Sequence, residues 1–212
     1  MLYAIYHWIV RITGYIPQLI LFRTRVHYED KAVQGRNLRS SAIVVSNHHG
    51  LMDFAVLLFV FWQRTLRCAV ADVTFNKSIF TKLLLKPFGC IKVDRENYDM
   101  VFLDRMKRIL SRGGVVEIYP EARIPKKDEE KPIAFKPSYV LLALESGAPI
   151  IPIYNNGKML GSGRRRVVVG KPIDASRLYD HSLTERENIR NINDFVRSKI
   201  IELGKELEKG EI

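Results

Sequence analysis

The sequence predicts one α/β domain, with a mostly parallel, mixed central sheet covered by helices, preceded by an N-terminal membrane-associating helical segment. Short β-rich runs alternate with helical stretches, which is typical of a parallel sheet. The 212 residues, 47% of them hydrophobic, suffice for one substantial core but not for two. Because the chain also begins with an apolar run, we divide it into an N-terminal segment at residues 1–22 and a domain at residues 23–212.

Residues 1–22 are too interrupted for a membrane span, which needs about 20 mainly apolar residues. Arg11 lies near their middle, and a helix break is expected at residues 14–17. Four apolar side chains share one helical face: Leu2, Ile5, Ile9 and Ile12. We therefore expect a short helix that lies in the membrane interface. The alternative is an ordinary core helix. A secretory signal peptide is disfavoured because no basic region precedes the apolar run.

The elements of the domain follow in order. Runs of β-branched and apolar residues predict the strands: 23–28 at a sheet edge, 42–46, 68–71, 90–93, 114–118, 150–154 and 166–169. Helical stretches predict the helices: the apolar 53–62, then 77–85, 98–110, 138–146 and the charged 184–208. Residues 119–136 are expected to form a polar loop.

The charge balance predicts an anionic partner. A net charge of +11 favours nucleic acid, an anionic membrane leaflet or a phosphorylated substrate. Nucleic acid is disfavoured, because no nucleic-acid-binding motif accompanies the basic run at 164–166 and the apolar N-terminus has no use there. Cys68 and Cys90 lie in apolar runs, so a disulfide framework or a zinc site is not expected.

Polar clusters follow three of the predicted strands, at residues 47–53, 94–97 and 119–123. Ligands bind beyond the carboxyl ends of the strands in open sheets of this kind, so we expect these clusters to converge. In the first cluster, His48 and Asp53 have a spacing that lets the carboxylate hold one ring nitrogen and leave the other as a base. Asn47 and Gly50 suit a tight turn there.

With these clusters, the chain resembles the glycerolipid acyltransferase family of the 1-acyl-sn-glycerol-3-phosphate acyltransferase type over residues 43–172. Four motifs occur in the family's order: Asn47-His48-x4-Asp53, the segment 89–95 ending in Arg95, Pro120-Glu121-Ala122-Arg123, and the proline-containing strand 149–153. The third motif is one residue shorter than the common form. Ala122 stands where the family usually has glycine, and Lys92 where it usually has an apolar residue.

The resemblance implies roles for these residues. His48 is the general base, and Asp53 fixes its tautomer. Arg95 and Arg123 bind the substrate phosphate, and Glu121 and Lys92 position the acceptor. Asn47 and Gly50 form the turn, where backbone amides stabilise the oxyanion. No metal and no cofactor are expected, since the acyl donor is acyl-CoA or acyl carrier protein.

The resemblance also implies an activity and a place. The expected reaction transfers a fatty acyl group to the sn-2 hydroxyl of a lysophosphatidate in phospholipid biosynthesis, giving phosphatidate. The expected place is the anionic phospholipid surface at the cytoplasmic face of the cell membrane, with the protein peripheral or monotopic. Glycerol 3-phosphate or another lysolipid as acceptor stays open. A noncatalytic basic peripheral membrane protein is the alternative of another class, and a hydrolase is disfavoured because no Gly-x-Ser-x-Gly motif occurs.

Overall fold

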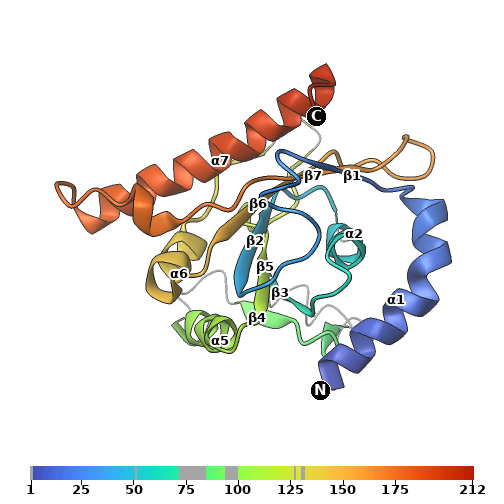
Figure 1. The fold of residues 1–212 in the computed structure, drawn as a ribbon, viewed down its shortest axis with the longest axis horizontal. Coiled ribbons are helices and arrows are strands. Elements are labelled where there is room, and N and C mark those ends of the chain that lie inside the picture. The colour runs from blue at the N-terminus through green and yellow to red at the C-terminus, as the bar shows by residue number, and fades with distance from the viewer. Residues whose placement is uncertain (1, 51, 72–84, 94–99, 127, 130–131) are drawn as a thin grey trace.

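The central sheet forms from the β-rich runs of the sequence. This computed structural model describes residues 2–50, 52–71, 85–93, 100–126, 128–129 and 132–212. Among these residues, seven strands form one sheet in the order β1-β7-β6-β2-β5-β3-β4 (Figure 1). They are β1 (Arg25–Tyr28), β2 (Ala42–Ser46), β3 (Leu66–Ala71), β4 (Ile91–Val93), β5 (Val115–Ile118), β6 (Ile150–Asn155) and β7 (Arg166–Val169).

The sheet is mixed, as predicted. Strands β2 to β6 run parallel to one another. β7 pairs antiparallel with β6, and the edge strand β1 pairs parallel with β7. The α/β class and the expected edge position of the first strand are therefore confirmed.

Helices cover both faces of the sheet. α5 (Met100–Ser111), α6 (Ser138–Ser146) and α7 (Glu185–Lys209) pack on one face, whereas α2 (Asp53–Val60) packs on the other. α1 (Leu2–Leu21) lies outside α2, and a short 3-10 turn, η1 (Ala175–Leu178), precedes α7 (Figure 1). The helix expected at 77–85 lies outside the described residues apart from Leu85. The other predicted helices are present: the bounds 138–146 are confirmed, and the described ends of the other helices differ from the prediction by one or two residues.

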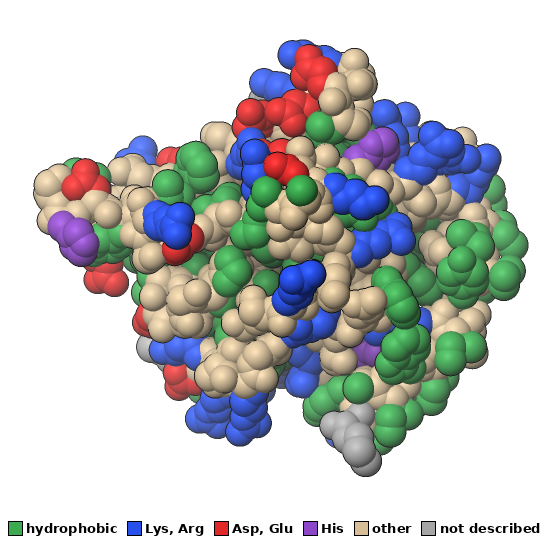
Figure 2. Space-filling view, viewed as in Figure 1, with side chains coloured by type: hydrophobic (Ala, Val, Ile, Leu, Met, Phe, Trp, Pro, Cys, Tyr) green, Lys and Arg blue, Asp and Glu red, His purple; other side chains and the backbone are tan. Residues whose placement is uncertain are grey.

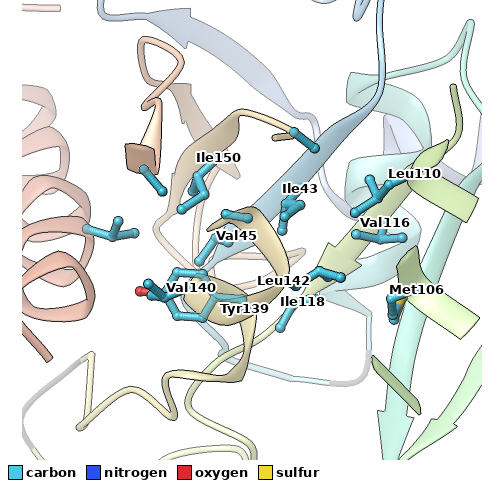
Figure 3. Packing of buried hydrophobic residues seen from close by; sticks show 14 of the residues in the cluster. Ile43, Val45, Met106, Leu110, Val116, Ile118, Tyr139, Val140, Leu142 and Ile150 are labelled. Carbon is cyan, nitrogen blue, oxygen red and sulfur yellow. The ribbon is translucent and has the colours of Figure 1, made fainter. Parts of the chain in front are cut away.

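Strand β2 shows why the central strands are apolar throughout. All five of its residues are buried, because helices cover both faces of the sheet. Ile43 and Val45 face α5 and α6, where Tyr139 and Met106 pack against the sheet (Figure 3). Val44 faces α2 on the opposite side. This close packing fixes the end of β2, where the polar residues of the first motif begin.

The N-terminal helix is longer than expected. α1 continues through Pro17 and does not end at the expected break. Gly14 serves packing instead, since a Cβ at this position would lie 3.2 Å from Cζ of Phe59 on α2. The helix therefore gains close contact with α2 at the position where the sequence pattern indicates an interruption.

The side of α1 that faces the protein carries buried polar residues. Three polar side chains are buried beneath the helix: His7, Arg11 and Gln18. Backbone carbonyls at a helix C-terminus lack partners within the helix, and the Arg11 guanidinium donates to three of them at and beyond the end of α2: Leu58, Phe61 and Arg64. The apolar residues of α1 are exposed, among them Leu2, Ile5, Ile9 and Ile12. These residues therefore lie outside the core, although Tyr6 and Val10 on the other side of the helix pack against it.

None of the helices formed by the described residues has the length and the apolar composition that crossing a bilayer requires.

Candidate active site

His48 and Asp53 meet in the turn that joins β2 to α2. The Nδ1 atom of His48 lies 2.9 Å from Oδ2 of Asp53, and a carboxylate oxygen can only accept this hydrogen bond. The histidine tautomer therefore carries its proton on Nδ1. Among the described residues, none hydrogen bonds with Nε2, so this nitrogen is available as a base. Asp53 is almost fully buried, whereas His48 keeps 14% of its side chain exposed.

The Asp53 carboxylate is held as an anion. Its Oδ2 atom also accepts from the backbone amides of His49 at 2.6 Å and Gly50 at 2.9 Å. Burial acts to raise the pKa of Asp53, but the hydrogen bonds from His48, His49 and Gly50 together hold that pKa below its ordinary value. The charge of Asp53 thus stabilises a positive His48. The Gly50 amide serves Asp53 and is not free to serve an oxyanion in this structure.

Arg165 binds the other oxygen of Asp53, a contact that the sequence analysis missed. Its Nη1 atom donates to Oδ1 of Asp53 at 2.8 Å and to Oδ1 of Asn155 at 2.7 Å. Arg165 is 3% exposed and Asp53 1%, so both charges are removed from water and depend on each other. In the sequence, Arg165 is one of three consecutive arginines, and no local pattern distinguishes it from its neighbours.

Asn47 and Asn155 join the ends of β2 and β6. The Asn47 side chain donates to the Asn155 carbonyl at 2.9 Å and accepts from the Asn155 amide at 2.8 Å. The Asn155 side chain donates in return to the Asn47 carbonyl at 3.0 Å. These three bonds fix the backbone next to His48. Asn47 therefore positions the turn through a distant strand, and Asn155 is a second residue that the sequence analysis missed.

Glu121 connects the polar loop to the catalytic turn. Its Oε1 atom accepts from the His48 amide at 2.6 Å, and its Oε2 atom accepts from the Ile133 amide at 3.2 Å. Burial raises the pKa of Glu121 above its ordinary value, although these two hydrogen bonds act in the opposite direction. The first and third polar clusters thus converge, as the sequence predicts. Ala122 has φ 58°, a left-handed conformation that favours glycine.

Tyr119 and Glu117 lie behind His48. The Tyr119 ring stacks on the His48 imidazole with 4.5 Å between centroids, and its hydroxyl donates to Oε1 of Glu117 at 2.5 Å. Burial raises the pKa of Glu117 to about 8. The hydrogen bond from Tyr119 acts to lower this pKa, and the negative charge of Asp53 acts to raise it. Glu117 is therefore mostly neutral at pH 7. The position of these two residues at the end of β5 does not predict from sequence that they are buried and hydrogen bonded to each other.

Among the described residues, the basic side chains expected to bind the acceptor are not gathered around His48 as Asp53 and Glu121 are. Arg123 is half exposed, and its guanidinium donates to both carboxylate oxygens of Glu129 at 2.6 and 2.5 Å. Lys92 is exposed on β4, and β3 and β5 separate that strand from β2, so the two strands are on the order of 14 Å apart. Arg95 and the rest of the cluster at 94–97 lie outside the described residues.

Comparisons with known proteins identify the family of the chain and a similar fold. A family model described as Acyltransferase matches residues 23–156, which is well over half of the chain and includes His48, Asp53 and Glu121. The search of curated proteins found no match. Among solved structures, the fold is similar to the crystal structure of the 1-acyl-sn-glycerophosphate (LPA) acyltransferase PlsC from Thermotoga maritima. The TM-score is 0.59 at 18% identity, over 86% of this chain and 73% of that one.

Proposed function

This chain belongs to the acyltransferase family, and we propose that it transfers a fatty acyl group from an acyl thioester to the sn-2 hydroxyl of 1-acyl-sn-glycerol 3-phosphate, forming phosphatidate. The observation that carries the proposal is the geometry of His48. Asp53 holds Nδ1 at 2.9 Å, and the partly exposed ring has its Nε2 atom without a partner among the described residues. A base with one nitrogen fixed and the other available suits the removal of a proton from a hydroxyl.

The proposed reaction is a direct transfer. Nε2 of His48 takes the proton of the acceptor hydroxyl while the hydroxyl oxygen attacks the thioester carbonyl carbon. The resulting oxyanion collapses, the carbon–sulfur bond breaks, and the proton passes from His48 to the leaving thiolate. Asp53 stabilises the imidazolium between these steps. General base catalysis of this kind contributes about 10²–10⁴-fold, and no acyl-enzyme is needed because a thioester is already activated.

We assign the acceptor phosphate to Arg123 together with Arg95. The Arg123 guanidinium binds both oxygens of Glu129, and a phosphate offers the same pair of oxygens to this planar fork. Glu129 would then be exchanged for the phosphate when the acceptor binds. Lys92 adds positive charge on β4, at the edge of the sheet. Glu121 acts through the His48 backbone and positions the base, rather than transferring a proton itself.

The lipid acceptor is favoured over glycerol 3-phosphate by the surface of α1. Its apolar side chains point away from the domain: Leu2, Ile5, Ile9, Ile12, Ile16 and Ile20 are between 47% and 76% exposed. Figure 2 shows hydrophobic side chains gathered along the edge of the molecule where α1 lies, with Lys and Arg side chains beside them. A soluble acceptor gives no reason for such a face. The Thermotoga maritima protein, similar in fold, carries a name that specifies the same acceptor.

The same surface supports a place for the protein at the cytoplasmic face of the cell membrane. An apolar helix face buries its side chains among lipid chains, and each Lys or Arg near an anionic leaflet contributes about 1 kcal/mol. With a net charge of +11, the chain is suited to anionic phospholipid. In this arrangement the enzyme meets its acceptor within the bilayer, and the donor, acyl-CoA or acyl carrier protein, arrives from the water.

The deciding experiment compares acceptors. Thiol release from a long-chain acyl thioester is measured at fixed salt with lysophosphatidate, with glycerol 3-phosphate, with lysophosphatidylcholine and without acceptor. We expect the highest kcat/KM with lysophosphatidate. A preference for glycerol 3-phosphate or for a lysolipid without a phosphomonoester would contradict the choice of acceptor, and release that needs no acceptor would indicate a hydrolase. Running the assay with acyl-CoA and with acyl carrier protein identifies the donor.

A further inference from the structure

The loop at residues 156–165, between β6 and β7, presents two apolar side chains to water. Met159 is 41% exposed and Leu160 is 60% exposed. The tip is ordered by its own hydrogen bonds, because the Ser162 hydroxyl accepts from the Met159 amide at 2.8 Å. Gly157, with φ +70°, allows the base of the loop to pack on His49. The loop therefore lies at the active-site end of the sheet with an exposed apolar tip.

The loop is attached to the C-terminal end of α1. The Leu160 amide donates to the Leu21 carbonyl at 2.7 Å, and the Arg165 amide donates to the Phe22 carbonyl at 2.9 Å. Figure 1 shows the loop beside this end of α1, on the same edge of the molecule. Ile20, in the last turn of α1, is 56% exposed. The apolar tip of the loop thus continues the exposed apolar face of α1.

The parts of the chain that contain α1 and the loop carry basic residues and no acidic ones. Residues 1–28 and 154–173 include no Asp or Glu, although the whole chain has 23 acidic residues. Around the junction of the two segments, Arg23, Arg25 and Lys158 are exposed. Two exposed apolar side chains in segments that carry exposed cations and no carboxylate are complementary to an anionic bilayer and not to another protein of mixed charge.

We infer that Met159 and Leu160 form a second bilayer contact, which inserts into the anionic leaflet beside α1. This inference rests on the membrane association proposed above. The same loop ends at Arg165, which binds Asp53. The loop thus links the proposed lipid contact at its tip to the proposed catalytic carboxylate.

Fluorescence quenching by lipids with brominated chains tests the contact. Vesicles contain equimolar phosphatidylcholine and phosphatidylglycerol, with the bromine on the acyl chains. The variant W8F/W62F/L160W carries its only tryptophan at the loop tip, and W62F keeps only Trp8 on α1. The matched control W8F/W62F/V101W places the tryptophan on α5, which covers the opposite face of the sheet, at a position 59% exposed in the wild type.

We expect quenching at position 160 comparable with that of Trp8 and none at position 101. Quenching of Trp8 without quenching at position 160 would overturn the loop contact while leaving the membrane association of α1 intact. If the protein does not sediment with the vesicles, both claims fail. A second measurement uses M159D/L160D, which should weaken vesicle partition by roughly tenfold or more, whereas V101D should leave the partition unchanged. An unchanged partition of M159D/L160D would also contradict the inference.

Discussion

Replacing Arg165 with methionine removes one member of a buried ion pair that touches the proposed catalytic carboxylate. The Arg165 side chain makes hydrogen bonds of 2.8 Å to Asp53 and 2.7 Å to Asn155, and both charges are at most 3% exposed. Breaking such a pair from one side costs about 3–5 kcal/mol, since the remaining charge stays buried without a partner. Asp53 keeps three donors on its other oxygen, so we expect the lower end of this range.

The loss of the Arg165 side chain should also slow catalysis. Without Arg165, the Oδ1 atom of Asp53 lacks its partner, and the carboxylate can rotate away from His48. A misplacement of about 1 Å in an active site can cost on the order of 100-fold, so kcat should fall by roughly tenfold to a hundredfold. Arg165→Lys should restore part of both losses. Arg166→Met is the matched control, because the one hydrogen bond from the Arg166 side chain to a described residue is a long one, 3.4 Å, to the Leu207 carbonyl.

The pH dependence gives an independent readout. The pKa of Asp53 is lowered in the folded protein, so its contribution to stability is present above its ordinary pKa and is lost as the pH falls through the lowered value. Because Arg165 contacts this carboxylate directly, the difference between wild type and Arg165→Met should be largest near pH 7, where Asp53 is ionised, and shrink in acid. Urea unfolding and thiol release measure the two effects. An Arg165→Met protein within 1 kcal/mol of wild type with unchanged kcat would refute the reasoning.

Three further predictions test other parts of the molecule. The buried Glu117 keeps its proton in the folded state between its ordinary pKa of 4.5 and about 8. The free energy of unfolding should therefore fall as the pH rises through this window, by at most about 1.4 kcal/mol per pH unit. Glu117→Gln should flatten this slope in urea unfolding. Arg123→Lys should raise the acceptor KM roughly tenfold with little effect on the donor KM, because lysine lacks the bidentate fork, whereas Glu129→Gln should not raise it. I9S/I16S should weaken sedimentation with anionic vesicles by roughly tenfold or more and leave the thermal midpoint unchanged, since both side chains are exposed; unchanged sedimentation would contradict the membrane role of α1.

The sequence predicts those parts of the fold whose structure depends on a local pattern of residues. Residues such as Val44 and Ile151 lie in short runs that are buried on both faces, and such runs predict central parallel strands directly. The position of α1 was not accessible in this way. Its apolar periodicity predicts a helix, but the face that packs on the domain includes buried polar side chains, because Arg11 satisfies carbonyls of α2 that no hydropathy pattern reveals.

The candidate site likewise contains contacts that the sequence predicts and contacts that it does not. His48 and Asp53 are five positions apart at the end of one strand, so their pairing is a local event that their spacing predicts. The contact between Arg165 and Asp53 joins positions 112 apart, and it depends on the antiparallel return of β7 along β6. Arg165 also lies beyond the segment matched by the family model. Tertiary structure alone identifies which of the three adjacent arginines is buried.

The most direct test of the central claim measures thiol release from a long-chain acyl thioester with lysophosphatidate in anionic vesicles, for wild type and for His48→Ala. We predict acceptor-dependent release in the wild type and a loss of about 10²–10⁴-fold in kcat for His48→Ala, with circular dichroism and vesicle binding unchanged. Asp53→Asn should also be strongly impaired, because the amide can support the wrong tautomer. Near-wild-type turnover in purified, folded His48→Ala would contradict the assignment of His48 as the general base.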